Sequence, residues 1–339
     1  MSLRKKLSPK TKAVIVNTPN NPTGVVYSEE TIQKLAAILE KKQKEFGTEI
    51  YLISDEPYRE LAYDGVEVPY LTKYYANTVV GYSFSKSLSL PGERIGYLVI
   101  PDEVADSEKL NAAANVATRI LGFVNAPTLQ QKVVKACLNE KTDISYYDRN
   151  RETLYNGLKK LGFECIKPEG AFYLFVKSPV ADEKEFCNTA KKYNILIVPG
   201  SSFGCPGYVR MAYCVAYETI VNALPQNLRS LRESIDRGST MAVREELLRN
   251  IRSVEPYVPG EQPQHKVVKL NTNENPYPPA PGVERVLKEM DTDRFRLYPD
   301  PTADELVGSL ADYYGVGKDQ VFVGVGSDDV ISMCFLTFF

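Results

Sequence analysis

The chain has 339 residues, of which 43% are hydrophobic and 25% are charged, and its formal net charge at pH 7 is −2. This balance is typical of a soluble globular protein with one large or two ordinary domains. It excludes the basic footprint of a nucleic-acid-binding protein. No apolar run approaches the roughly 20 residues that a membrane-spanning helix needs.

The histidine and cysteine content limits the kinds of catalytic or metal site that the chain can form. His265 is the only histidine, so a multi-histidine zinc site is excluded, and a Ser-His-Asp triad would have to use this one residue. The six cysteines form no CxxC pair, which favours reduced thiols in a cytoplasmic protein. We therefore expect the chemistry to depend on lysine, carboxylates, tyrosines or a cofactor, without a bound metal.

The first part of the chain alternates strand and helix signals. Residues 12–17 form a short run rich in valine and isoleucine, as in a buried parallel strand. A helix is predicted to begin after Ser28, an N-cap residue, and to end at Gly47. The strand signal then recurs at residues 50–54, 78–84 and 95–100. This alternation predicts a mostly parallel, doubly wound α/β sheet.

The rest of the chain has a different pattern of predicted elements. Residues 124–161 are helical in pattern, and short mixed segments follow at 171–176, 195–199 and 208–214. These predict a smaller α+β domain. Near the end of the chain, Thr302 and Glu305 have the spacing of a capping box that opens a helix, and a strand is predicted at residues 320–325.

Polar residues of complementary kinds follow three of the predicted strands. NTPNNPTG (17–24) follows the first strand, Asp55 and Tyr58 follow the second, and Ser83 to Lys86 end the third. In an open parallel sheet, ligands bind in the crevice beyond the carboxyl ends of the strands. We therefore expect these side chains to face the same crevice.

The motifs resemble those of fold-type I pyridoxal-phosphate enzymes, specifically the class I/II aminotransferases, and residues 8–225 resemble the aspartate-aminotransferase-like branch. The matching motifs, in family order, are NNPTG (20–24), SDEPY (54–58), SFSKSLSLPGERIG (83–96), PEGAFYLF (168–175) and YVRMAYC (208–214). The resemblance implies pyridoxal 5'-phosphate as the cofactor.

The resemblance assigns four residues to the cofactor's ring. Lys86 would bind the aldehyde covalently and then act as general base and acid. Asp55 would pair with the pyridine nitrogen and keep it protonated, which makes the ring an electron sink. Tyr58 and Asn21 would hydrogen-bond the ring's phenolate oxygen.

Four further residues are assigned to the phosphate and the substrate. Ser83, Ser85 and Arg94 would bind the phosphate, since hydroxyls and a planar guanidinium suit its oxygens. Arg210 matches the family arginine that clamps the substrate's α-carboxylate through a bidentate fork.

Residues 241–339 resemble a different branch, the amino-terminal part of histidinol-phosphate aminotransferase. The motifs are LLRNIRSVEPYVPGE (247–261), KLNTNENPYPP (269–279), RLYPDPTADEL (296–306) and GVGSDDVI (324–331). The resemblance implies that Gly326, Ser327 and Asp328 bind the phosphate at a helix N-terminus. It also implies that Tyr298 reaches the cofactor phosphate of a partner subunit and that Asn275 contacts the substrate.

The order of these pieces departs from the family, in which the second piece precedes the first. The sequence therefore resembles a circularly permuted or chimeric aminotransferase, joined at residues 237–240, and domain termini often tolerate such joining. At least one stretch of βαβ size is missing, which would leave unpaired strand edges. We expect a large cofactor-binding domain at 8–120 and 295–339 and a small domain at 150–236 and 241–294, with an interdomain helix at 121–149.

The expected function is transfer of an amino group between an α-amino acid and a 2-oxo acid, with an aspartate-like or histidinol-phosphate-like substrate. The resemblance implies a homodimer with shared active sites. Two alternatives stay open. A β-lyase or decarboxylase of the same fold would use Lys86 and Asp55 as well, although Arg210 favours transamination. A non-catalytic recombined fragment is the other, because the missing stretch normally supplies the aromatic residue that stacks on the pyridine ring.

Overall fold

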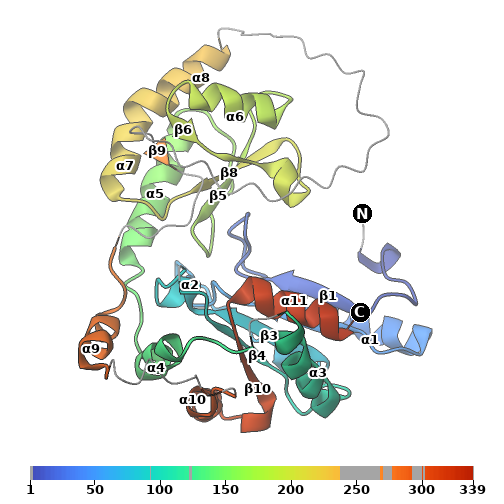
Figure 1. The fold of residues 1–339 in the computed structure, drawn as a ribbon. Coiled ribbons are helices and arrows are strands. Elements are labelled where there is room, and N and C mark those ends of the chain that lie inside the picture. Colours follow the sequence, from blue (N-terminus) through green and yellow to red (C-terminus); the bar gives the residue numbers. More distant parts are fainter. Residues whose placement is uncertain are drawn as a thin grey trace.

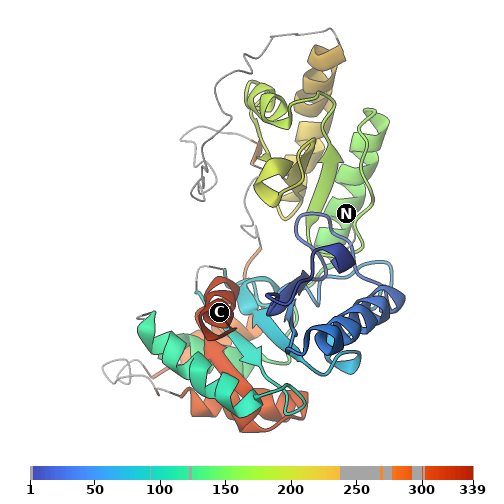
Figure 2. The ribbon, with the colours of Figure 1, turned by 90° about the vertical axis from the view of Figure 1, so that its right-hand side faces the viewer.

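The computed structural model describes residues 3–91, 93–121, 124–236, 268–269, 277–291, 300 and 302–338. Figure 1 shows two units, one above the other. The lower unit is built on a five-stranded sheet, and the upper unit contains a small three-stranded sheet. The view in Figure 2 shows the same division from the side.

The five-stranded sheet has the order β1-β2-β3-β4-β10. Its strands are β1 (Ala13–Asn17), β2 (Tyr51–Asp55), β3 (Thr78–Ser83), β4 (Gly96–Val99) and β10 (Val321–Gly324). The first three are parallel, whereas β4 is antiparallel to both of its neighbours. The α/β prediction is confirmed, but β4 is not parallel to β3, because the short connection between them holds only the four-residue helix α2 (Phe84–Ser87). A parallel connection usually needs a full crossover helix.

Helix α1 (Glu29–Phe46) provides such a crossover between β1 and β2. The hydroxyl of Ser28 caps its first turn by accepting from the backbone N–H of Thr31. Gly47 ends it in the left-handed conformation, at φ 63°, which glycine adopts without steric cost. Both predicted boundaries of this helix are confirmed.

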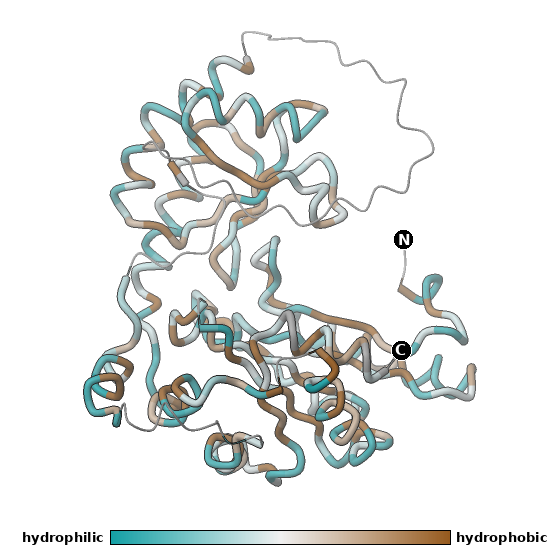
Figure 3. The backbone as a smooth tube through the Cα atoms, in the orientation of Figure 1, coloured by the Kyte–Doolittle hydropathy of each residue, from teal (hydrophilic) through white to brown (hydrophobic). Residues whose placement is uncertain are grey.

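Helices cover both faces of the sheet. On one face lie α3 (Ser107–Ile120) and α11 (Ser327–Phe338), and Val330 and Met333 of α11 pack against Val79 and Leu98. On the other face lie α1, α4 (Thr128–Cys137) and α10 (Asp304–Tyr314). The strands in the lower unit of Figure 3 are correspondingly hydrophobic.

Strand β10 and helix α10 come from the last part of the chain. The strand pairs with β4 and completes the sheet.

The predicted capping box at the start of α10 is wrong. The side chain of Asp300, and not that of Thr302, accepts from the backbone N–H of Asp304 at 2.7 Å, and it accepts from the N–H of Thr302 as well.

The upper unit surrounds the antiparallel sheet β5-β8-β7, formed by β5 (Tyr173–Lys177), β8 (Tyr208–Ala212) and β7 (Val198–Pro199). Beside it, β6 (Ile195–Leu196) pairs in parallel with β9 (Val268–Lys269). The helices of this unit are α5 (Ser145–Lys160), α6 (Glu183–Lys191), α7 (Tyr217–Asn222), a π-helical turn (Ala223–Leu228) and α8 (Arg229–Asp236).

The remaining helices are short or lie at the border of the lower unit. Helix α9 (Pro281–Glu289) contributes Val283 to the same apolar cluster as α4 and β10. Turns of 3-10 helix occur at Leu3–Lys5, Leu71–Lys73, Gly200–Phe203 and Lys318–Gln320. The exact bounds of the two domains stay a prediction.

Strand β1 forms an edge of the five-stranded sheet, and within the described part of the chain no strand pairs with its outer side. Ile15, in the middle of β1, is 41% exposed, on the face that α11 covers further along the sheet. All six cysteines are free thiols. Of the helices that the structure describes, none combines the length and hydrophobicity needed to cross a lipid bilayer.

Candidate active site

The three parallel strands end in polar residues at one edge of the sheet. Asn17 ends β1, Asp55 ends β2 and Ser83 ends β3. Asn17 lies directly opposite Asp55 in the β1–β2 register. The carboxyl ends of parallel strands share an edge, so the side chains that follow them converge there.

The carboxylate of Asp55 is held by Asn17. The Asn17 Nδ2 group donates to Asp55 Oδ2 at 2.9 Å and to the main-chain oxygen of Asp55 at 3.1 Å. The Oδ1 atom of Asn17 accepts from the backbone N–H of Asn21 at 2.7 Å. The acid at the end of β2 is thereby connected to the turn that follows β1.

Arg210 approaches this turn from the upper unit. It lies in the middle of β8, only 8% exposed, and its Nη1 donates to Asn21 Oδ1 at 3.0 Å. Its guanidinium carbon lies 4.5 Å from the ring centroid of Tyr173 and 4.8 Å from that of Phe203. Cation–π contacts of this kind hold a guanidinium in place, and a guanidinium binds an anion through its in-plane N–H groups.

Tyr58 follows β2 and lies almost completely buried. Its hydroxyl is hydrogen-bonded to that of Tyr173 at 3.1 Å. Burial raises the pKa of Tyr58 above its ordinary value, so the phenol keeps its proton at neutral pH and can donate it in a hydrogen bond. Sequence reasoning did not select Tyr173, although it lies within the motif PEGAFYLF.

Lys86 lies on α2, half-buried, near the rings of Tyr58 and Phe172. Its Nζ is 5.8 Å from the ring centroid of Tyr58 and 5.3 Å from that of Phe172. Contacts therefore run without interruption from Lys86 to Tyr58, and on through Tyr173 and Arg210 to the turn and the acid.

Phe172 and Tyr173 are positioned by a tight crossing of two loops. Ala171 has a φ of 57°, and its carbonyl oxygen accepts from the hydroxyls of Tyr63 at 2.6 Å and Tyr213 at 3.1 Å. Nearby, a Cβ atom on Gly24 would lie 2.3 Å from the Cβ of Pro168, so only glycine fits there.

The residues expected to bind a phosphate lie at the other end of the site. The hydroxyls of Ser83 and Ser85 are 2.8 Å apart, and the Ser83 hydroxyl also caps α2. Arg94 is exposed and donates from Nη1 to the carbonyl oxygen of Pro91. A Cβ atom on Gly326 would lie 3.0 Å from Arg94 Nη2, so the guanidinium rests over the glycine that precedes α11.

Gly96 permits this approach. It is paired with Ser83 in the sheet, and a Cβ atom on it would lie 2.4 Å from the carbonyl oxygen of Tyr82 and 3.2 Å from the Cα of Gly326. Ser327 is the first residue of α11, where backbone N–H groups favour an anion. Asp328 lies in the first turn of the same helix, and its side chain is outside the described part of the structure, as are Tyr298 and Asn275.

This donor set fits pyridoxal phosphate. A lysine amine, a strand-end carboxylate and a buried phenol meet the needs of the aldehyde and the ring. Two hydroxyls, a guanidinium and a helix N-terminus beside two close-packed glycines form a cradle that suits a phosphate.

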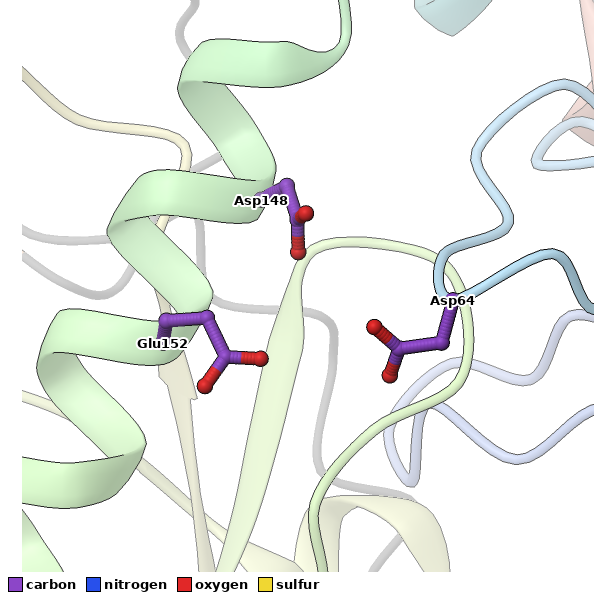
Figure 4. Close-up of side chains that lie close together, drawn as sticks. All are labelled: Asp64, Asp148 and Glu152. Atoms are coloured by element: carbon purple, nitrogen blue, oxygen red, sulfur yellow. The ribbon is translucent and has the colours of Figure 1, made fainter.

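Three carboxylates cluster outside this site, as Figure 4 shows, but their neighbours explain them. Arg151, fully buried, contacts Asp64 at 2.8 Å, Asp148 at 2.6 Å and Glu152 at 3.1 Å. Lys167 contacts Glu152 at 2.5 Å and Asp64 at 3.3 Å. Two cations thus balance the cluster, which is an ion-pair network between α5 and the loop that follows Tyr63.

Comparison with known proteins places these features in a family. Residues 2–225 and 265–339 match the family Aminotransferase class I and II. Aromatic-amino-acid aminotransferase 2 of Thermococcus litoralis is 32% identical over 68% of this chain and 60% of its own. Histidinol-phosphate aminotransferase of Chromohalobacter salexigens is 60% identical over 26% of this chain and 25% of its own.

Solved structures agree with these relatives. The crystal structure of an amino transferase from Eubacterium rectale aligns with a TM-score of 0.66 and 52% identity, over 68% of this chain and 58% of its own. The aspartate aminotransferase of Thermus thermophilus with maleate aligns with a TM-score of 0.56 and 28% identity, over 68% and 59%. The chain spans about 60% of the length of the first of these curated relatives. It belongs to the class I and II aminotransferase family, whose members use pyridoxal phosphate.

Proposed function

We propose that this chain is a pyridoxal-phosphate-dependent aminotransferase that moves an amino group between an α-amino acid and a 2-oxo acid. The observation that carries the proposal is the unbroken set of contacts from Lys86 through Tyr58, Tyr173 and Arg210 to Asn21. It brings an amine, a phenol donor and a guanidinium to the edge of the sheet where Asp55 lies.

Pyridoxal phosphate, when bound, supplies an aldehyde and an electron-withdrawing ring. Lys86 would hold the aldehyde carbon, and would then take the proton from the substrate's Cα and deliver it to that carbon. Asp55, fixed by Asn17, would hold a proton at the ring nitrogen. Tyr58 would donate to the phenolate oxygen, and Asn21 would donate from Nδ2 while its Oδ1 accepts from Arg210.

The phosphate would be bound by Ser83, Ser85 and Arg94 together with the N-terminus of α11 at Gly326, Ser327 and Asp328. Tyr298 of a second copy would add a hydroxyl, which is why a homodimer is part of the proposal. The six free thiols fit a reducing compartment, and we propose the cytoplasm.

Arg210 would bind the α-carboxylate of the substrate by a bidentate fork, assisted by Asn275. A site that retains the carboxylate in this way disfavours decarboxylation. The relatives are named for aromatic amino acids, aspartate, aspartate or prephenate, and histidinol phosphate. These names support an aspartate-like or histidinol-phosphate-like substrate.

The order of the motifs along the sequence, with residues 8–225 ahead of residues 241–339, supports the proposal of a permuted or chimeric chain. One set of relatives aligns with about two thirds of the chain, and the histidinol-phosphate aminotransferases align with about a quarter. In the fold, β10 and α10 of the last segment join the sheet of the first.

The test is to add pyridoxal phosphate to the purified protein, reduce with borohydride and locate the modified residue by peptide mass spectrometry. We expect the label on Lys86, an absorbance band that changes with pH, and loss of both in Lys86→Ala. Lys73→Ala, which removes an exposed lysine, is the matched control and should change neither.

Amino acids are then added one at a time to the loaded protein, beginning with aspartate, tyrosine and histidinol phosphate. Conversion of the band with release of the 2-oxo product would identify the donor. Labelling scattered over surface lysines, with no donor converting the band, would contradict the proposed activity and would support the alternative of a non-catalytic fragment.

A further inference from the structure

We infer that Asn17 is a positioning residue of the candidate site. Its side-chain amide is bonded to the acid Asp55 and to the turn that contacts Arg210. It thereby fixes the position of Asp55 relative to Arg210, the group proposed to bind the substrate's carboxylate. The inference rests on the proposed function, because it assigns Asn17 a role in how that site acts on its substrate.

The chemistry of the neighbours fixes which way the amide points. The carboxylate of Asp55 can only accept hydrogen bonds when ionised, and the backbone N–H of Asn21 can only donate one. Asn17 must therefore turn Nδ2 toward Asp55, at 2.9 Å, and Oδ1 toward Asn21, at 2.7 Å. A flipped amide would lose both bonds, so the arrangement is unique.

The backbone around Asn17 leaves this amide little freedom. Asn17 ends β1 in register with Asp55, and Thr18, the next residue, is fully buried and accepts from the N–H of Tyr27. The turn itself is closed by the bond from Gly24 N–H to the carbonyl oxygen of Asn20 at 2.8 Å. Because the amide is bonded to two ordered segments, it fixes the position of one segment relative to the other.

The path continues into the upper unit. Asn21, whose N–H is held by Asn17, accepts through Oδ1 from Arg210 at 3.0 Å. Three hydrogen bonds in series therefore connect the Asp55 carboxylate to the Arg210 guanidinium. If Asn17 is lost, we expect two effects: Asp55 loses a donor, and the turn that orients Arg210 loses its anchor.

Two substitutions separate these effects. Asn17→Asp keeps an acceptor for the Asn21 N–H but removes the donor to Asp55, whereas Asn17→Leu removes both at similar volume. Asn20→Asp is the matched control, because it introduces the same charge into the same turn. Asn20 is hydrogen-bonded to Thr23 and to the carbonyl oxygen of Asn17, and none of its described side-chain hydrogen bonds reaches Asp55.

The first measurement needs no cofactor. Hydrogen exchange of the Asn21 amide, followed by NMR on the apoprotein, should be slow in the wild type, in Asn17→Asp and in Asn20→Asp, and fast in Asn17→Leu. Equal protection in all four proteins would overturn the assigned contact. This measurement stands even if the wild type takes up no pyridoxal phosphate, in which case the proposed function fails separately.

The second measurement uses steady-state kinetics of the loaded protein. Asn17→Asp should lower kcat by about tenfold with little change in KM, and Asn17→Leu should lower kcat/KM by about 100-fold with a raised KM, as expected for a misplaced site. Asn20→Asp should stay near the wild type. Changes confined to protein stability, with kcat and KM unaltered in both Asn17 variants, would contradict the positioning role.

Discussion

The two ends of the candidate site are built in different ways. One end, the acid-and-carboxylate end, holds Asp55 and the proposed binding site for the substrate's carboxylate. There, hydrogen bonds among buried or half-buried groups hold Asp55, Arg210 and Tyr58. At the end that we propose for the phosphate (the phosphate end), an exposed arginine, Arg94, lies over Gly326, which comes from a segment far away in the sequence. The first end is fixed by directed bonds, the second by close backbone packing.

The difference indicates what each end depends on. The acid-and-carboxylate end is preorganised, and a preorganised donor set costs no rearrangement when a ligand arrives. The phosphate end depends on the docking of α11, which is held to the sheet by buried apolar residues such as Val330 and Met333. Substitutions that disturb packing should therefore harm the phosphate end, and loss of single polar groups should harm the other.

The largest expected effect is at Gly96. In Gly96→Ala the new methyl group would lie 2.4 Å from the carbonyl oxygen of Tyr82, and the backbone of β4 would have to move away from Gly326. We expect the free energy of unfolding to fall by about 1–3 kcal/mol, as in other overpacked sites. Urea unfolding measures this loss, and equilibrium dialysis should show that the affinity for pyridoxal phosphate falls by about tenfold or more.

Gly308→Ala is the control for this substitution. Gly308 lies inside α10 of the same unit, and a Cβ atom there would meet only the flexible end of Lys318. Because alanine favours a helix more than glycine does, stability should be unchanged or higher. If the two variants bound the cofactor equally well, the phosphate end would not depend on the approach of β4 to α11.

Much of the fold could be predicted from local signals. Ser28 and Gly47 mark both ends of α1 because capping depends on the residue and its nearest neighbours. The direction of β4 could not be predicted in this way, since it depends on which connection the chain takes. The capping of α10 by Asp300 was missed because two side chains within reach, Asp300 and Thr302, are both suitable acceptors.

The candidate site shows the same limit. The motif residues Asp55 and Lys86 follow predicted strands, and the common edge of a parallel sheet accounts for their placement. Asn17 and Tyr173 were missed because one looks like the last residue of a strand and the other like a core aromatic. Their partners, Asp55 for Asn17 and Arg210 for Tyr173, become visible only when segments far apart in sequence are brought together.

A smaller effect is expected at the acid-and-carboxylate end, in Tyr173→Phe. This change keeps the ring against Arg210 and removes the hydroxyl that is bonded to Tyr58. We expect a loss of about 1 kcal/mol in unfolding free energy and a cofactor affinity about fivefold weaker, the usual worth of one hydrogen bond. Urea unfolding and equilibrium dialysis measure the two quantities.

Tyr75→Phe is matched to it, because it removes a buried hydroxyl that donates to the carbonyl oxygen of Ile50 at 2.6 Å but leaves Tyr58 untouched. Its stability should fall by a similar amount while its cofactor affinity stays constant. Should both variants lose affinity equally, the Tyr58–Tyr173 bond would have no special part in the site.

The smallest expected effect is a pH dependence of the stability, in the ion-pair network between α5 and the loop after Tyr63, which lies outside the candidate site. The hydrogen bonds that Asp64 accepts from Arg151 lower the pKa of the Asp64 carboxyl below its ordinary value. A carboxyl whose pKa is lower in the folded protein stabilises the fold above its unfolded pKa, near 4, and this contribution is lost as the pH falls through the folded pKa.

The side chain of Asp64 is 51% exposed, so solvent screening keeps the contribution below about 1 kcal/mol. Asp64→Asn should therefore be slightly less stable than the wild type near pH 7, and the gap should close as urea unfolding is repeated down to about pH 3. A gap that widened on acidification would mean that the Asp64–Arg151 pair does not stabilise the folded protein.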